Sequence, residues 1–122
     1  VIAFAPQLNA WDQLVGDGDC GDTLKTGAER ILASVDELRG SGALADSAAV
    51  LAALGERAQA MGGSSGALYN IGFTAAARSA AAAAAAAEPE PRMWCSALSA
   101  AAAAISEVGG ARPGYRTMLD AL

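Results

Sequence analysis

The sequence predicts an all-α fold, a bundle of antiparallel helices. Apolar residues recur at helical spacing along most of the chain, and no stretch alternates apolar and polar residues as a half-buried strand would. Aromatic residues make up only 5% of the sequence, although hydrophobic residues make up 53%. A core so rich in alanine has to be built from helices that approach each other closely, and 122 residues are enough to bury one such core.

Three helices are predicted in the first half of the chain. Residues 1–12 begin in mid-pattern without a cap, so we expect this helix to start before the first residue. The second helix is predicted over residues 22–39, with Asp22 as its N-cap, and the glycines within residues 40–42 end it. The third helix is predicted over residues 46–61 because apolar residues again recur at helical spacing.

The second half predicts two long helices and the start of another. A helix rich in alanine is predicted over residues 67–87, a proline-containing turn over 88–91, and a further helix over 92–108. Residues 109–114 form a glycine-rich loop, and residues 115–122 are predicted to start one more helix. Because the chain stops inside this apolar run, we expect the domain to be incomplete at both ends.

Composition excludes several classes of protein. A formal net charge of −5 disfavours nucleic acid and an anionic membrane surface as partners. The absence of histidine excludes a Ser-His-Asp triad and a zinc site built on Cys and His. The two cysteines, Cys20 and Cys95, do not suggest a secreted disulfide framework. Charged residues at Arg78 and Glu88 interrupt the alanine-rich stretch too closely for a membrane span. We therefore expect a cytoplasmic protein.

Three carboxylates lie close together in the segment Asp12–Cys20, those of Asp12, Asp17 and Asp19. The glycines between them permit a sharply turned loop that folds back on the end of the first helix. Crowded carboxylates repel one another unless a hard cation lies between them, and ligands that are all oxygen suit Mg²⁺ or Mn²⁺. The alternative is a solvated turn, because Asp and Gly are common turn residues.

A second glycine-rich stretch, Gly62–Gly66, lies directly before a predicted helix. Such a loop leaves backbone N–H groups free at the positive end of the helix dipole, which suits a phosphate. It is not a Walker A loop, since no Gly-Lys-Ser/Thr follows, and it is not a dinucleotide fingerprint, since no strand precedes it. The alternative is an ordinary turn between helices with a serine N-cap.

Two arginines in and after the third glycine-rich stretch, Arg112 and Arg116, are unusual positive charges in an acidic chain. They are candidates to meet phosphate, and the alternative is a pair of surface arginines at a helix end. Because successive helices of a bundle alternate in direction, we expect the three glycine-rich stretches to gather at one end of it.

Three stretches together resemble a single family. They are Leu8–Asp12 with Gly16–Gly21, then Gly62–Tyr69, then Gly114–Asp120. In order and spacing they resemble the nucleotide-binding L domain of dihydroxyacetone kinases, here over residues 1–122. The resemblance implies an α-helical barrel of about eight antiparallel helices.

The resemblance also implies a site for ATP or ADP and two Mg²⁺ ions. Asp12, Asp17 and Asp19 would hold the two ions, which bridge the phosphates of the nucleotide. The phosphates would also be bound by the backbone and hydroxyl groups of the second glycine-rich stretch, which are those of Gly62, Gly63, Ser64, Ser65 and Gly66.

Other positions matched to the family motifs concern the adenine and the type of kinase. Gly110 and Met118 would lie beside the adenine, and Cys20 and Arg116 are further candidates for nucleotide binding. Tyr115 stands where the family usually has an acidic residue, so the contact expected from that carboxylate is in doubt. Cys20 occupies a place that is His in subunits working with a phosphotransferase system, and the cysteine resembles single-chain, ATP-dependent kinases more closely.

The predicted function is the ATP-binding part of a kinase that phosphorylates dihydroxyacetone or a similar short ketose or triose. In this family a separate K domain, in the same chain or another subunit, holds the substrate through a histidine, which this chain lacks. Phosphoryl transfer needs mainly positioning and charge neutralisation, so we expect no general base here and almost no transfer by the chain alone. A homodimer is one option for the full-length kinase.

Other functions stay open at this stage. An L subunit that retains ADP and is rephosphorylated by a phosphotransferase protein has the same fold, as does a domain serving another substrate. A calcium-binding module that is not an enzyme is disfavoured, because Asp22 and Ala28 stand where an EF-hand requires Gly and Glu. A purely structural bundle is disfavoured by the clustered glycine-rich stretches.

Overall fold

A computed structural model describes residues 1–87 and 90–122, and within these ranges it contains helices and no strand. The prediction of an all-α fold is confirmed. The α-helices of the described residues are α1 (Ala5–Asp12), α2 (Cys20–Ala33), α3 (Val35–Gly40), α4 (Ser47–Ala58), α5 (Gly63–Ala85) and α6 (Glu90–Gly109). Short 3₁₀ helices accompany them, namely η1 (Ile2–Phe4), η2 (Ala43–Ala45), η3 (Gln59–Met61) and η4 (Met118–Asp120).

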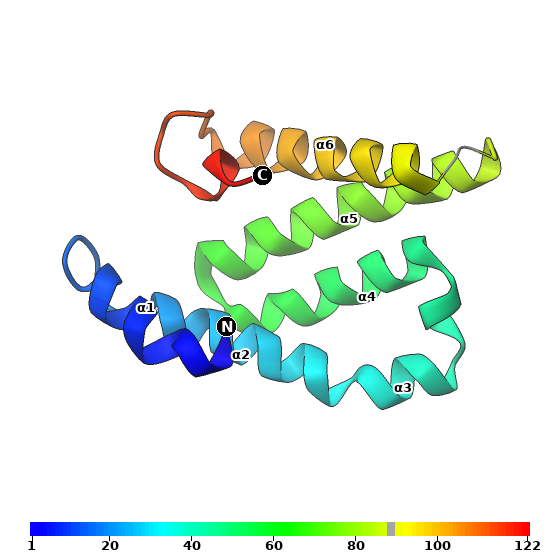
Figure 1. The fold of residues 1–122 in the computed structure, drawn as a ribbon. Coiled ribbons are helices and arrows are strands. Elements are labelled where there is room, and N and C mark those ends of the chain that lie inside the picture. The colour runs from blue at the N-terminus through cyan, green and yellow to red at the C-terminus, as the bar shows by residue number, and fades with distance from the viewer. Residues whose placement is uncertain (88–89) are drawn as a thin grey trace.

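The long helices pack as antiparallel neighbours (Figure 1). α1 packs on α2, α2 on α4, α4 on α5, and α5 on α6. The loop after α1, the start of α5 and the loop after α6 all lie on the left of Figure 1. The three glycine-rich stretches therefore gather at one end of the helices, as expected from their alternating directions.

The core is built from small residues, which lets the helices approach closely. Its largest buried cluster is made mainly of alanines from α5 and α6, with Leu51 from α4 and Met93 from α6. A Cβ added to Gly72 of α5 would lie only 2.8 Å from Cδ1 of Ile105 of α6. A side chain at residue 72 would require Ile105 to move, in agreement with the predicted close approach of the helices.

The helix predicted over residues 22–39 is divided in two. Ser34 is buried between α2 and α3, and its hydroxyl donates a hydrogen bond to the carbonyl oxygen of Ile31 at 2.8 Å. Such a bond competes with the helical hydrogen bonds of the backbone and explains the break. The prediction that Asp22 is the N-cap is wrong: α2 starts at Cys20, so Asp19 is the N-cap and Asp22 lies in the first turn.

Other helix boundaries follow local signals in part. Asp46 caps α4, because its carboxylate accepts hydrogen bonds from the N–H groups of Ala48 and Ala49 at 2.8 and 3.3 Å. The predicted turn over residues 88–91 lies partly outside the described residues, and α6 already begins at Glu90. No helix of the described residues is long and apolar enough to cross a membrane.

Two predictions about the glycine-rich stretches need correction. Gly62–Gly66 is not a loop before the helix, because α5 begins at Gly63 and only Gly62 precedes it. The helix predicted over residues 115–122 is reduced to η4, a single 3₁₀ turn. Arg116, with φ at 60°, interrupts any longer helix there, since the left-handed region is incompatible with helix continuation.

Candidate metal and nucleotide site

The loop between α1 and α2 is organised by the side chain of Asp12, the last residue of α1. One oxygen of this carboxylate, Oδ2, accepts hydrogen bonds from three successive N–H groups, those of Gly18, Asp19 and Cys20, at 2.9, 3.0 and 3.2 Å. Gly18 adopts a φ of 82°, a conformation that glycine reaches without strain. The loop therefore folds back over the end of α1, as its glycines predicted.

This fold brings the three predicted carboxylates together. Asp12, Asp17 and Asp19 each offer one oxygen, and these oxygens all lie within 4.8 Å of one another. Asp12 is partly buried, whereas Asp17 and Asp19 are exposed. The negative charge of Asp17, followed by desolvation and the charges of neighbouring carboxylates, raises the pKa of Asp19 above its ordinary value of 3.8. The repulsion anticipated from the sequence is therefore present.

The geometry of these carboxylates fits a hard divalent cation. Two oxygens bound to the same Mg²⁺ are at most about 4.2 Å apart, because Mg–O distances are about 2.1 Å. The carboxylate oxygens lie up to 4.8 Å apart, so they need to move only slightly closer to bind one ion. The same spacing leaves room for the carboxylates to bridge two ions. Oδ2 of Asp12 is engaged by the loop, so Oδ1 is the oxygen of Asp12 available to a cation.

The start of α5 offers free hydrogen-bond donors. The first helical bond of its backbone runs from the N–H of Gly66 to the carbonyl of Gly62, at 2.9 Å. Within residues 1–87 and 90–122, no carbonyl accepts from the preceding N–H groups, those of Gly63, Ser64 and Ser65. The side chain of Ser64 is exposed and that of Ser65 is partly buried. Ser64 and Ser65 therefore lie inside the first turn, and neither is the N-cap.

The first turn of α5 is positioned by close backbone contacts. A Cβ at Gly66 would lie 3.1 and 3.2 Å from the carbonyl oxygens of Gln59 and Ala58. Met61 of η3 packs against Gly27 of α2. The segment that precedes α5 therefore also contacts α2, the helix that follows the loop with Asp17 and Asp19. The carboxylates and the start of α5 are thus linked through η3, although they come from separate helices.

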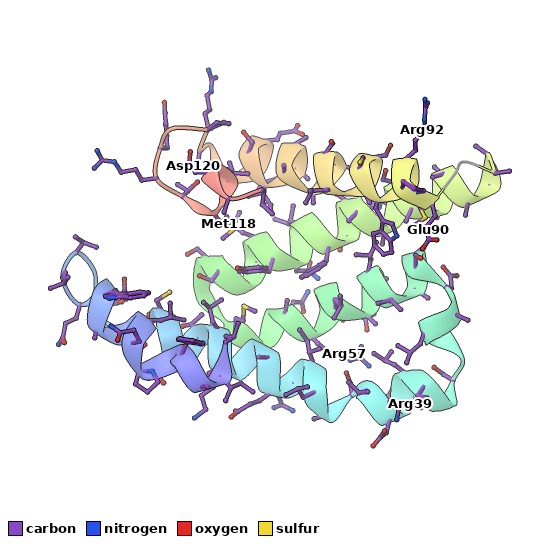
Figure 2. All side chains as sticks on the ribbon, in the orientation of Figure 1. Arg39, Arg57, Glu90, Arg92, Met118 and Asp120 are labelled. Atoms are coloured by element: carbon purple, nitrogen blue, oxygen red, sulfur yellow. The ribbon has the colours of Figure 1, made fainter. Side chains whose placement is uncertain are left out.

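The residues after α6 that were predicted to bind the nucleotide lie in different surroundings. Met118 is directed from η4 toward α5 (Figure 2), where it lines an apolar cavity of about 320 Å³ between α5 and α6. Aromatic residues line the same cavity, namely Tyr69, Phe73 and Trp94. Gly110 and Arg116 are exposed. No ion pair of the described residues includes Arg112 or Arg116, so neither arginine meets the carboxylate cluster.

The thiol of Cys20 lies at the edge of the carboxylate cluster and is partly buried. Burial, assisted by the negative charges of Asp12 and Asp19, raises the pKa of this thiol above its ordinary value of 9.0. A raised pKa disfavours the thiolate, which is the nucleophilic form of cysteine. Both cysteines of the chain are free.

Two residues near the site were missed at the level of sequence. Asn9 contacts the start of α2 with its side-chain amide. Asp120 closes the loop before η4 by accepting hydrogen bonds from the N–H groups of Gly114 and Thr117, the latter at 2.8 Å. Asn9 stands three positions before Asp12, a spacing that places both side chains on one face of α1, and this was the available signal.

Comparison with known proteins identifies the family. Residues 14–122 match the family described as the DAK2 domain. The chain belongs to this family. The resemblance inferred from the three sequence stretches is confirmed.

Relatives with curated descriptions match the whole chain. It is 42% identical to a putative 3,4-dihydroxy-2-butanone kinase of Solanum lycopersicum over 123 residues, covering 100% of this chain and 20% of the relative. It is 38% identical to the triokinase/FMN cyclase of Mus musculus, with the same coverage of both chains. It is 35% identical to the dihydroxyacetone kinase of Komagataella pastoris, again over 100% of this chain and 20% of the relative. The chain thus spans about a fifth of the length of these relatives, and no solved structure gives a significant match.

Proposed function

We propose that this chain is the nucleotide- and magnesium-binding domain of a kinase that transfers the γ-phosphate of ATP to dihydroxyacetone or a similar short ketose or triose. The observation that carries this proposal is the cluster of Asp12, Asp17 and Asp19, whose oxygens lie within 4.8 Å of one another. Family membership supports it, because relatives of this chain are named as kinases.

The three carboxylates would hold two Mg²⁺ ions. Bound there, the ions would neutralise the charge of the nucleotide phosphates and fix their orientation. Asp12 would contribute through Oδ1 while its Oδ2 keeps the loop folded. Asp17 and Asp19 are exposed and free to turn toward a cation, so their side chains would supply most of the remaining protein oxygens.

The start of α5 would bind the phosphates from the other side. The N–H groups of Gly63, Ser64 and Ser65 lie at the positive end of a long helix, and they suit an anion for that reason. The hydroxyl groups of both serines add further donors. Gly62 and Gly66 would act through the backbone, by letting the turn form and by letting it lie against α4.

The loop after α6 would serve the nucleoside. Met118 lies beside an apolar cavity lined by aromatic residues, which suits the face of a purine. Gly110 would approach the base by its backbone, and Cys20 and Arg116 are secondary candidates for contact with the nucleotide. Cys20 would act only as a neutral thiol, because its pKa is raised.

The substrate would be held by a K domain outside this chain. The relatives are about five times longer than the segment they share with it, which leaves room for such a domain. Phosphoryl transfer needs mainly positioning and charge neutralisation, so no general base is required of this chain, which would contribute nucleotide, metal and charge neutralisation. We therefore expect the chain alone to bind Mg–ATP and to show almost no transfer.

Isothermal titration of ATP and ADP tests the proposal, with and without Mg²⁺. We expect magnesium-dependent binding in the wild type, and its loss in Asp17→Asn and Asp19→Asn. Asp36→Asn is the matched control, because Asp36 is an exposed carboxylate on α3 that forms, among the described residues, an ion pair with nearby Arg39 alone. Wild-type binding that ignores magnesium, or that survives both substitutions, would contradict the proposal.

A further inference from the structure

The side chain of Asn9 joins α1 to the first turn of α2. Its oxygen Oδ1 accepts hydrogen bonds from the N–H groups of Gly21 and Asp22, at 2.7 and 3.2 Å. Its nitrogen Nδ2 donates to Oδ2 of Asp22 at 3.0 Å. Asn9 therefore caps α2 from a different helix, since Asp19, the N-cap residue, makes no capping bond with its own side chain.

Asn9 and Asp12 act on one continuous piece of backbone. Asp12 accepts from the N–H groups of residues 18, 19 and 20, and Asn9 accepts from those of residues 21 and 22. Every N–H group from Gly18 to Asp22 thus has its acceptor on a side chain of α1. The two acceptors stand three residues apart, on one face of the helix.

A steric contact fixes the same junction. A Cβ at Gly21 would clash with the carbonyl oxygen of Ala5, so the start of α2 lies directly against the backbone of α1. Asp19 immediately precedes α2 and Asp17 lies two residues earlier. The position of both carboxylates relative to Asp12 therefore depends on how the start of α2 sits on α1.

We infer that Asn9 is a positioning residue for the carboxylate cluster: it holds the start of α2 on α1 and so sets Asp17 and Asp19 opposite Asp12. An amide is suited to this place, because it supplies two acceptor bonds and one donor bond to Asp22 and adds no charge beside three carboxylates. Asn9 does not touch the metal in this role. The inference rests on the proposed function, in which the cluster binds Mg²⁺.

Binding of Mn²⁺ by the full chain, followed by the electron paramagnetic resonance signal of the free ion, tests this role. We expect Asn9→Ala to weaken Mn²⁺ binding about tenfold to a hundredfold, as for other residues that orient metal ligands. Hydrogen exchange of the Gly18, Asp19 and Cys20 amides should accelerate in the same variant. In the double variant Asn9→Asp with Asp22→Asn, the amide and the carboxylate change places. This variant should recover most of the affinity that Asn9→Ala loses, because an acceptor and a donor again face each other.

Asp46→Ala is the matched control for a merely structural role. Asp46 also accepts two N–H groups at the start of a helix, but it caps α4 and has no contact with the cluster. We expect this variant to lose comparable stability and to bind Mn²⁺ like the wild type. Equal losses of affinity in Asn9→Ala and Asp46→Ala, or no recovery in the exchanged pair, would overturn the inference.

The experiment also separates two kinds of failure. Wild-type chain that binds no Mn²⁺ would refute the proposed function, and the metal-positioning role with it, even if Asn9→Ala accelerates amide exchange in the loop. Wild-type binding with unchanged affinity and unchanged exchange in Asn9→Ala would refute the role of Asn9 and leave the proposed function standing.

Discussion

Asp12 has two separable tasks, and two substitutions distinguish them. Oδ2 accepts from three N–H groups of the loop, which leaves Oδ1 to bind a cation in the proposed site. Asp12→Asn keeps an oxygen that can accept the three bonds but removes the charge. Asp12→Ala removes both. We expect both variants to lose magnesium-dependent nucleotide binding, and only the alanine variant to lose substantial stability.

The magnitude follows from the geometry of the loop. Losing a side chain that satisfies helix-start N–H groups costs about 0.5–2 kcal/mol, and Asp12→Ala belongs in the upper half of this range because three groups lose their acceptor. For a chain of 122 residues this corresponds to a fall in Tm of about 3–10 °C. Asp12→Asn should stay within about 0.5 kcal/mol of the wild type, since the bonds persist and repulsion within the cluster is relieved.

Thermal unfolding followed by circular dichroism, without metal and with Mg²⁺, provides the assay. The wild type should gain stability on addition of Mg²⁺, and neither variant should. If Asp12→Ala unfolds at the wild-type temperature without metal, the three N–H bonds do not hold the loop. If Asp12→Asn falls as far as Asp12→Ala, the charge and not the hydrogen-bonding shape of the side chain organises it. Either result would refute the reasoning.

Three further predictions concern the loops and the thiols. Gly21→Ala should lower the free energy of unfolding in urea by more than about 2 kcal/mol, because its Cβ would clash with the backbone of α1, whereas Gly40→Ala should be nearly neutral because nothing lies within 4 Å of that Cβ. Backbone N–H groups, chiefly those of Gly114 and Thr117, lower the pKa of Asp120 below its ordinary value of 3.8, so its stabilising contribution is present above pH 3.8 and is lost as the pH falls through the lowered pKa. Asp120→Asn should reduce that acid-dependent loss in Tm measurements. Iodoacetamide at neutral pH should modify exposed Cys95 well before Cys20, whose pKa is raised by burial.

Each of these predictions has an outcome that contradicts it. Equal stability of the two glycine variants would show that α1 and α2 are not in close contact at residue 21. An acid unfolding profile unchanged by Asp120→Asn would show that the loop before η4 does not depend on that carboxylate. Mass spectrometry that finds Cys20 modified first would show that the carboxylate loop opens readily or that its thiol is activated.

Local sequence was sufficient for the carboxylate cluster. Asp12 ends α1 and Asp17 and Asp19 lie in the loop that follows, so the chain between them is too short to let them separate widely, and glycine supplies the turn that brings them together. The cap of α4 at Asp46 also depends on local sequence, since its bonds reach only two and three residues ahead, although Asp46 was predicted as the first residue of that helix and not as its cap. Features that depend on residues so close together in the sequence can be predicted without knowledge of how the helices pack.

Helix boundaries that depend on contacts between separate helices could not be predicted from local sequence in this way. The start of α5 at Gly63 is stabilised where Gly66 meets carbonyl oxygens at the end of α4. The break at Ser34 depends on a buried hydroxyl that turns back to Ile31, and an exposed serine in the same sequence could have stayed helical. Propensity alone favoured continuous helix at both the break and the last residues of the chain.

By itself, the sequence determined the all-α class, the end of α3 at its glycines, the three-carboxylate loop and the DAK2 family. The loop and the helix end depend on residue type and on neighbours within a few positions, whereas the fold class and the family depend on patterns that recur along the chain. Only the tertiary structure showed that Asn9 of α1 caps α2 and that Met118 lies over a cavity between α5 and α6. Asn9 lies 12 residues before Gly21, so their hydrogen bond exists only because α1 and α2 pack together.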